Sequence, residues 1–289
     1  MVRLAALLLL AAATAAHAQG AAGTTRTATV TITATPGRLA VAESIPAGPV
    51  TFVLQNRAGV AVSAQLLAVR RDHTPAEAAQ ILATGAPLPE WISAAGGVGA
   101  VAAGGVASVT HSLPPGGYVV ASTVPDSAGT PQYRRGYVAP LRAAGQGGFA
   151  TVPGVSLVIA AGSSSFRATP VSETDGRRIE LVGRQRGRPL QHGELVIEIE
   201  TTGRTAHEIA LVRMDSTAML RQYVQWFGGG QRGRAPGRPF GGVGVLPPSQ
   251  RVWLRVRLEP GTYWFYCNAI HQAGRRGYEV GEYAQIAVR

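Results

Sequence analysis

The chain has 289 residues, 46% of them hydrophobic, and a formal net charge of +11. Its 27 basic side chains are all arginine, and no nucleic-acid motif surrounds their densest stretch, Arg232 to Arg238. A single cysteine excludes an internal disulfide, and no stretch after the start reaches the roughly 18 apolar residues of a transmembrane helix. We therefore expect neither nucleic-acid binding nor a membrane span.

The first 18 residues have the pattern of a secretory signal peptide. A short positive start, Met1 to Arg3, precedes an apolar run, and Ala16-His17-Ala18 is a small-x-small cleavage site. We expect cleavage after Ala18 and a mature protein that is periplasmic or secreted.

An internal repeat organises the rest of the chain. AGPVTFVLQN, GGVGA and LPPGGYVVAS begin at residues 47, 96 and 113, and they match HGELVIEIET, GGVGV and LEPGTYWFYC at 192, 241 and 258. All three pairs are offset by 145 residues (192 − 47, 241 − 96, 258 − 113), which indicates two copies of one domain. We place the copies at residues 24–142 and 173–289, with a linker and ragged domain ends at 143–172.

In the first copy, the pattern predicts a strand and then a short helix. Residues 50–54 alternate between large apolar and smaller or polar side chains, as in a half-buried strand. The helix should begin after the N-cap Thr74, with Pro75 first and Glu77 as capping-box partner, and should stop at Gly85.

In the second copy, the corresponding strand is predicted at residues 195–199, followed by a helix that ends at Gly228. Residues 252–258 alternate in the same way, and a Pro-Gly turn then leads into an aromatic strand, 263–266. Many short strands with one short helix per copy indicate an all-β fold of two tandem Greek-key β-sandwiches.

Three residues of the second copy are candidate metal ligands. His207 follows the strand 195–199, Cys267 ends the aromatic strand, and His271 comes four residues later. One thiolate and two imidazoles are the trigonal donor set of type 1 copper. Each residue also has an ordinary interpretation, since a lone cysteine is more often a buried strand-end residue and a lone histidine a core or loop residue.

On these residues and the stretch YCNAIHQAG, the second copy resembles the cupredoxin family of plastocyanin-like and azurin-like blue copper proteins. The resemblance extends over both copies. It implies cupredoxin-type sandwiches, one copper ion held by His207, Cys267 and His271, and single-electron transfer.

The pattern departs from the family at the expected methionine, where Gly277 is followed by Tyr278. Tyr266 and Asn268 flank Cys267, so the His-x-His pairs of a trinuclear oxidase centre are missing. We therefore expect no enzyme and no catalytic residue. The acidic residues near the site are interpreted as surface carboxylates: Glu208, Glu279 and Glu282.

The first copy carries no such ligands. Ser122 stands in place of Cys267, and matching AQLLAVR with HEIALVR puts Ala64 in place of His207. Gln132 is placed at the histidine position of the loop and Tyr137 at the methionine position. We expect this copy to be metal-free.

Two functions stay open at this point. One is an exported copper-binding protein that acts as a single-electron carrier and whose arginine-rich surface meets a redox partner with an acidic surface. The alternative is a metal-free, cupredoxin-like binding or structural module.

Overall fold

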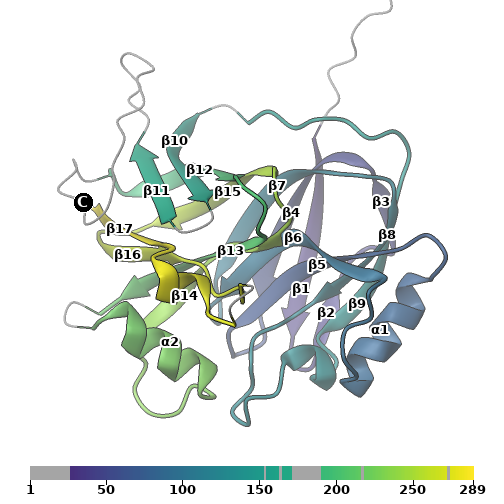
Figure 1. Cartoon of the computed structure of the whole chain (residues 1–289), viewed down its shortest axis with the longest axis horizontal. Helices are drawn as coiled ribbons and strands as arrows, with labels where there is room; N and C mark the ends of the chain where they lie inside the picture. The colour runs from purple at the N-terminus through teal and green to yellow at the C-terminus, as the bar shows by residue number, and fades with distance from the viewer. Residues whose placement is uncertain (1–26, 153, 163–164, 171–189, 216–217, 272–273) are drawn as a thin grey trace, which may run out of the picture.

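Figure 1 shows the computed structural model, which describes residues 27–152, 154–162, 165–170, 190–215, 218–271 and 274–289. The predicted signal peptide and its cleavage site lie outside the described residues. None of the described helices is long and apolar enough to cross a membrane.

The first half contains strands β1 to β9, one α-helix and one 3-10 turn. Their bounds are β1 Ala28–Thr35, β2 Arg38–Ala40, β3 Ser44–Pro46, β4 Gly48–Asn56, β5 Val62–Val69, α1 Pro75–Thr84, β6 Ile92–Val101, β7 Val106–Leu113, β8 Gly116–Ala121, η1 Gln132–Arg135 and β9 Val138–Ala144.

The described elements of the second half follow the same order, except that none of them corresponds to β3. Its bounds are β10 Val155–Gly162, β11 Ser165–Pro170, β12 Gly193–Thr201, β13 His207–Met214, α2 Leu220–Gly228, β14 Gly237–Leu246, β15 Arg251–Leu258, β16 Gly261–Tyr266, η2 Gly277–Val280 and β17 Tyr283–Val288.

The described strands form two sheets, and each sheet runs through both halves (Figure 1). The strand orders are β11-β10-β12-β15-β7-β4-β1-β2 and β17-β16-β13-β14-β6-β5-β8-β9-β3. The halves join through two antiparallel pairs, β15 with β7 and β14 with β6. The predicted all-β fold of tandem sandwiches is confirmed, with the addition that the two sandwiches share their sheets.

The alternation seen in the sequence sets which side chains enter the core. Val50, Phe52 and Leu54 in β4 are fully buried, and Ile197 and Ile199 repeat this in β12. One hydrophobic cluster contains all five and continues through both halves. The halves therefore share one core as well as two sheets.

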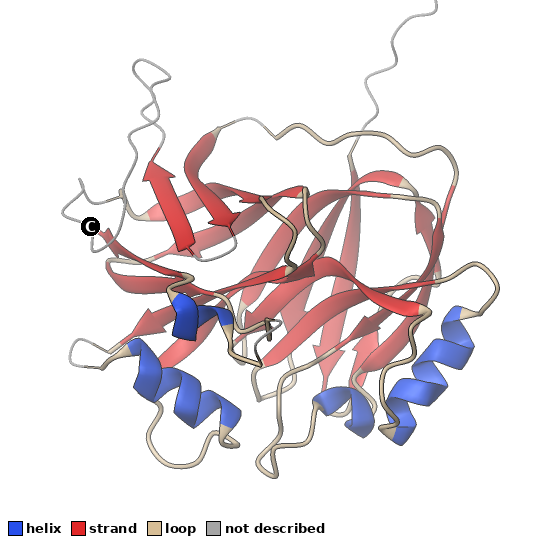
Figure 2. Ribbon diagram, in the orientation of Figure 1, coloured by secondary structure: helices blue, strands red, loops and turns tan. Residues whose placement is uncertain are grey.

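Both predicted helices are present at the outside of the sheets (Figure 2). The Thr74 side chain accepts the backbone N–H of Glu77, and the Glu77 side chain accepts that of Thr74, so the capping box is confirmed. Gly85 ends α1 in the left-handed conformation, at φ +75°. Helix α2 ends at Gly228, as predicted.

The predicted linker range, residues 143–172, contains two strands of the second half. β10 pairs parallel with β12 and antiparallel with β11, as β1 does with β4 and β2. Ile159 lies opposite Ile199 as Ile32 lies opposite Leu54, so the offset is 159 − 32 = 127 in one pair and 199 − 54 = 145 in the other. The extra 18 residues (145 − 127) lie between β11 and β12, and they hid this part of the repeat.

The repeated GGVG block lies on the two strands that join the halves, β6 and β14. Gly97 and Gly242 have φ of +99° and +116°. A Cβ on Gly97 would collide with the Ala64 carbonyl, and one on Gly242 with the Ile209 carbonyl. Both copies therefore require a glycine at this position, because the backbone φ is positive and a Cβ has no room.

His111 in β7 is a buried, unsatisfied histidine. It is 5% exposed, and its Nε2 has no hydrogen-bond partner within the described residues. Burial lowers its pKa from 6.5 to about 4. The second half has Val256 at this position (256 − 111 = 145), so the fold does not need a polar group there.

We expect His111→Val to stabilise the protein and to weaken its acid sensitivity. As the pH falls below 6.5, His111 becomes protonated in the unfolded chain, whereas in the folded protein it stays neutral until about pH 4. The free energy of unfolding of the native protein should therefore drop by roughly 3 kcal/mol over this window. Urea unfolding near neutral pH and at about pH 4.5 measures this term. An identical pH dependence in the variant would contradict it.

Candidate metal centre

The structure brings His207, Cys267 and His271 together. His207 is the first residue of β13, Cys267 directly follows β16, and His271 lies in the loop before η2. Their donor atoms and one carboxylate oxygen of Glu282 all lie within 4.8 Å of one another. The three predicted residues therefore meet the geometric condition for sharing one ion.

Glu282 was interpreted as a surface carboxylate, and that interpretation was wrong. Its side chain is fully buried, and its Oε2 accepts hydrogen bonds from His207 Nδ1 at 3.2 Å and His271 Nε2 at 3.0 Å. Its Oε1 is buried and has no hydrogen-bond partner among the described residues. An unsatisfied buried carboxylate oxygen is unfavourable, and a cation beside it would remove that penalty.

The Cys267 sulfur is fully buried but receives hydrogen bonds suited to a thiolate. Burial is the main cause that raises the pKa of the thiol far above its usual range, and the charge of Glu282 raises it further. The backbone N–H groups of Glu208 and Ala269 act in the opposite direction and lower that pKa. A metal ion would displace the thiol proton, and these donors would then stabilise the bound thiolate.

Burial favours the neutral form of the His207 imidazole. Burial lowers its pKa, the Glu282 carboxylate raises it, and His271 lowers it. Thr205 Oγ1 lies 3.1 Å from His207 Nε2, and the Phe166 ring meets the imidazole edge-on at 6.2 Å between centroids. A neutral imidazole is the form that binds metals.

The backbone of Gly277 packs closely against these donors. A Cβ at this position would lie 2.7 Å from Cys267 Sγ and would collide with the Glu282 carboxylate. Every residue except glycine would therefore push a side chain into the cluster.

The first half has the same loop, but the residue correspondence differs from the predicted one. Val62 lies opposite Val101 as His207 lies opposite Leu246, so Val62 rather than Ala64 is the counterpart of His207 (207 − 62 = 145). The similarity of AQLLAVR to HEIALVR is shifted by two residues from the strand register.

Backbone hydrogen bonds fix the rest of the correspondence at the same offset. Ser122 N–H donates to Tyr137 O at 2.9 Å, as Cys267 N–H donates to Glu282 O at 3.0 Å. Ser122 is thus the counterpart of Cys267, as predicted, but Tyr137 is the counterpart of Glu282. The repeated RRGY, which matches at an offset of 141, does not follow the structural register.

Gln132 is the counterpart of Gly277 rather than of His271. The backbone pattern of the loop instead matches Asp126 with His271, because each donates its N–H to the residue four positions on. The Gln132 side chain accepts from Ser122 Oγ at 2.8 Å and donates to Ala61 O at 2.9 Å. The first half therefore has an amide side chain at the position where the second half has a glycine, which has no side chain.

Tyr278, at the methionine position expected from the sequence, does not join the cluster. Its backbone N–H donates to Cys267 O at 2.8 Å, and its ring packs against Tyr266 and helix α2. The fourth group beside the donors is Glu282, which sequence reasoning missed. The sequence feature that could have identified Glu282 is its alignment with Tyr137 at the offset of 145, at the end of the same loop.

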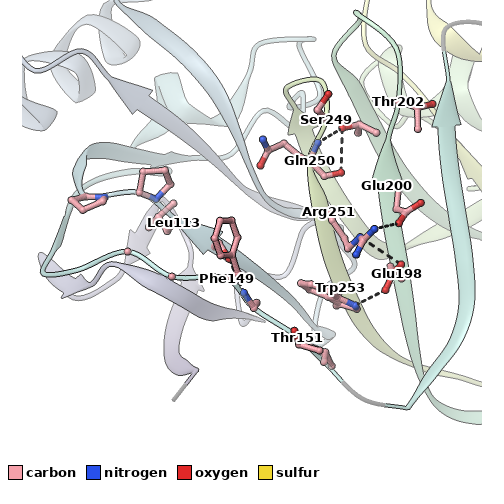
Figure 3. Close-up of a pocket in the computed structure, with 18 of the residues that line it drawn as sticks. Leu113, Phe149, Thr151, Glu198, Glu200, Thr202, Ser249, Gln250, Arg251 and Trp253 are labelled. Carbon is pink, nitrogen blue, oxygen red and sulfur yellow. Dashed lines mark hydrogen bonds and ion pairs between the residues drawn. The ribbon is translucent and has the colours of Figure 1, made fainter. Parts of the chain in front are cut away.

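A groove with both polar and apolar lining lies elsewhere, on the outer face of the other sheet (Figure 3). It has a volume of about 1180 Å³ and is lined by residues 147–152 and by side chains of β12 and β15. Arg251 pairs with Glu200 at 2.6 Å, and Trp253 Nε1 donates to Glu198 at 3.0 Å. Because these groups satisfy one another, we assign the candidate chemistry to the histidine–cysteine cluster.

Neither a protein-family model nor a curated protein matches the chain. Among solved structures, it is similar to an auracyanin from the photosynthetic bacterium Roseiflexus castenholzii, at 15% identity and a TM-score of 0.29, over 46% of this chain and 94% of that one. It is also similar to auracyanin A, a "blue" copper protein of Chloroflexus aurantiacus, at 18% identity and a TM-score of 0.29, over 41% of this chain and 100% of that one. A multicopper oxidase matches at 10% identity and a TM-score of 0.27, over 91% of this chain and 89% of that one. These scores are too low to carry an assignment, which must come from the site itself.

Proposed function

We propose that the chain is an exported, cupredoxin-type protein that binds one copper ion in its second half and carries single electrons. His207, Cys267 and His271 would hold the ion. The observation that carries this proposal is the convergence of their donor atoms with Glu282 within 4.8 Å. A bound copper ion would supply one-electron redox chemistry.

The donor set supports copper on chemical grounds. A thiolate is a soft ligand, and two imidazoles complete a set that suits copper better than magnesium or calcium. The orphaned Oε1 of Glu282 fits a cation among these residues, and the glycine at position 277 keeps any side chain out of the cluster.

Fixed backbone positions support electron transfer rather than loose metal storage. Cys267 is tied to Glu282 across the last hairpin, and the His271 N–H donates to Arg275 O at 2.8 Å. Donors held in this way move little when the charge of the ion changes.

One ligand offers an entry point for electrons. The side chain of His271 is 12% exposed, whereas that of His207 is fully buried. A redox partner would approach the site at His271. A partner with an acidic surface would be attracted by the net charge of +11.

Copper titration of the purified protein tests the proposal. One equivalent of Cu(II) should produce an intense thiolate-to-copper absorption band and a Cu(II) EPR signal. Cys267→Ser should abolish the band and weaken Cu(II) binding by at least about 100-fold, because the soft ligand is lost.

His192→Ala is the matched control, since His192 is an exposed histidine of the same half. It should leave the band unchanged. A protein that stays colourless with Cu(II) would instead favour the metal-free binding or structural module.

A further inference from the structure

The candidate site contains two acidic groups, and the only basic groups within the cluster, among the described residues, are two imidazoles. Glu282 pairs only with the two imidazoles among the described residues, and Cys267 is its neighbour within the same cluster. No guanidinium bonds to the Glu282 carboxylate in the part of the chain that the structure describes. A deprotonated Cys267 beside the Glu282 carboxylate would bring two negative charges together inside the protein, which is strongly unfavourable without a cation.

The backbone holds the carboxylate in this position. Gly281 ends η2 at φ +101°, and the Glu282 N–H then donates to Gly277 O at 2.9 Å. Since Glu282 O also accepts from the Cys267 N–H, the two acidic residues face each other across one hairpin. These backbone hydrogen bonds fix the position from which the Glu282 side chain enters the cluster.

The fold itself does not require a carboxylate here. In the first half the same register position holds Tyr137, a buried residue of the core, and the counterparts of the other donors are Val62, Ser122 and Asp126. The inward-facing carboxylate is therefore present in the half that also has the cysteine and the two histidines, and it is replaced in the half that lacks them.

Charge counting shows what such a donor set neutralises. A thiolate and a carboxylate contribute two negative charges, and two neutral imidazoles contribute none. A divalent ion would balance the buried charge, whereas a monovalent ion would leave one negative charge uncompensated.

We infer that Glu282 is a fourth donor that makes this site prefer a divalent ion, so that it holds Cu(II) in strong preference to Cu(I). This inference rests on the proposed function. It makes the centre a low-potential one, and one that also accepts other divalent ions such as Co(II).

Glu282→Gln tests the inference, because glutamine keeps a hydrogen-bond acceptor for the histidines but removes the charge. The ratio of Cu(II) to Cu(I) affinity should fall about 100-fold in the variant. At 59 mV per tenfold for one electron, the reduction potential should rise by about 120 mV. A redox titration of the copper-loaded proteins measures this shift.

Redox-inert probes give an independent readout. Co(II) affinity should fall at least about 10-fold in Glu282→Gln, while Ag(I) affinity should change by less than about threefold, since only the divalent ion needs the second anion. Glu279→Gln is the matched control. Its carboxylate, in the same turn, accepts the Arg276 backbone N–H, so removing its charge should change neither ratio.

The outcomes separate the two proposals. If the native protein binds no Cu(II), the proposed function fails. If it binds Cu(II) with a band that Cys267→Ser removes, but Glu282→Gln keeps the native Co(II)-to-Ag(I) ratio and potential, the proposed function stands and the inference about Glu282 is overturned. A purely structural role for Glu282 would lower the stability of the metal-free protein and leave both ratios unchanged.

Discussion

Gly277→Gln should weaken Cu(II) binding by at least about 100-fold while the protein stays folded. The substitution copies the first half, where Gln132 occupies this position and bonds to Ser122 and to the Ala61 carbonyl. In the second half, the Cβ of the new side chain would collide with Cys267 and the Glu282 carboxylate. The space needed by an ion would be filled by a side chain.

Copper titration followed by the visible band measures the effect, and thermal unfolding of the metal-free variant checks the fold. Gly277→Ala should weaken binding less, because the alanine side chain is smaller than that of glutamine, although its Cβ would still lie 2.7 Å from the sulfur. Gly228→Ala is the control, since a Cβ there would meet nothing within 4 Å. Native copper affinity in Gly277→Gln would contradict the assignment of the site.

Gly242→Ala should lower the free energy of unfolding by at least about 3 kcal/mol. Its φ of +116° is strained for any residue with a Cβ, and the new methyl group would collide with the Ile209 carbonyl. Relief requires β13 and β14 to separate at the point where β14 also pairs with β6 of the first half.

Urea unfolding measures this loss, and in a chain of this size the melting temperature should fall by roughly 6–12 °C. Gly97→Ala should behave alike, because Gly97 has the same relation to Ala64 in the first half. Gly228→Ala again serves for comparison and should change the stability by no more than about 1 kcal/mol. A Gly242→Ala protein as stable as the native one would show that the strands can move apart without loss.

The repeat, the strands and the first helix could be predicted because their signals are local. Alternating side chains identified β4, β12 and β15, and the residues from Thr74 to Gly85 identified both ends of α1. The strands β10 and β11 were missed because their offset is 127 rather than 145, and a search in one register passes over them.

The site was only partly predictable, because ligand residues can be recognised by type but their register cannot. His207, Cys267 and His271 are rare residues in a known spacing. Glu282 is a common residue after a glycine, and its burial follows only from the pairing of the last two strands. The same missing information misplaced the counterparts of His207 and His271, since short sequence matches competed with the true alignment.

The sharing of both sheets also gives the first half a structural role. Without it, β14 and β15 would lose the strands that pair with their outer edges, and the N–H and C=O groups paired there would be exposed to other molecules. The first half shields these edges from self-association and amyloid-like stacking. A mutation that weakens the pairing of β14 with β6 or of β15 with β7 should therefore cause aggregation, seen as turbidity at high protein concentration, before it affects metal binding.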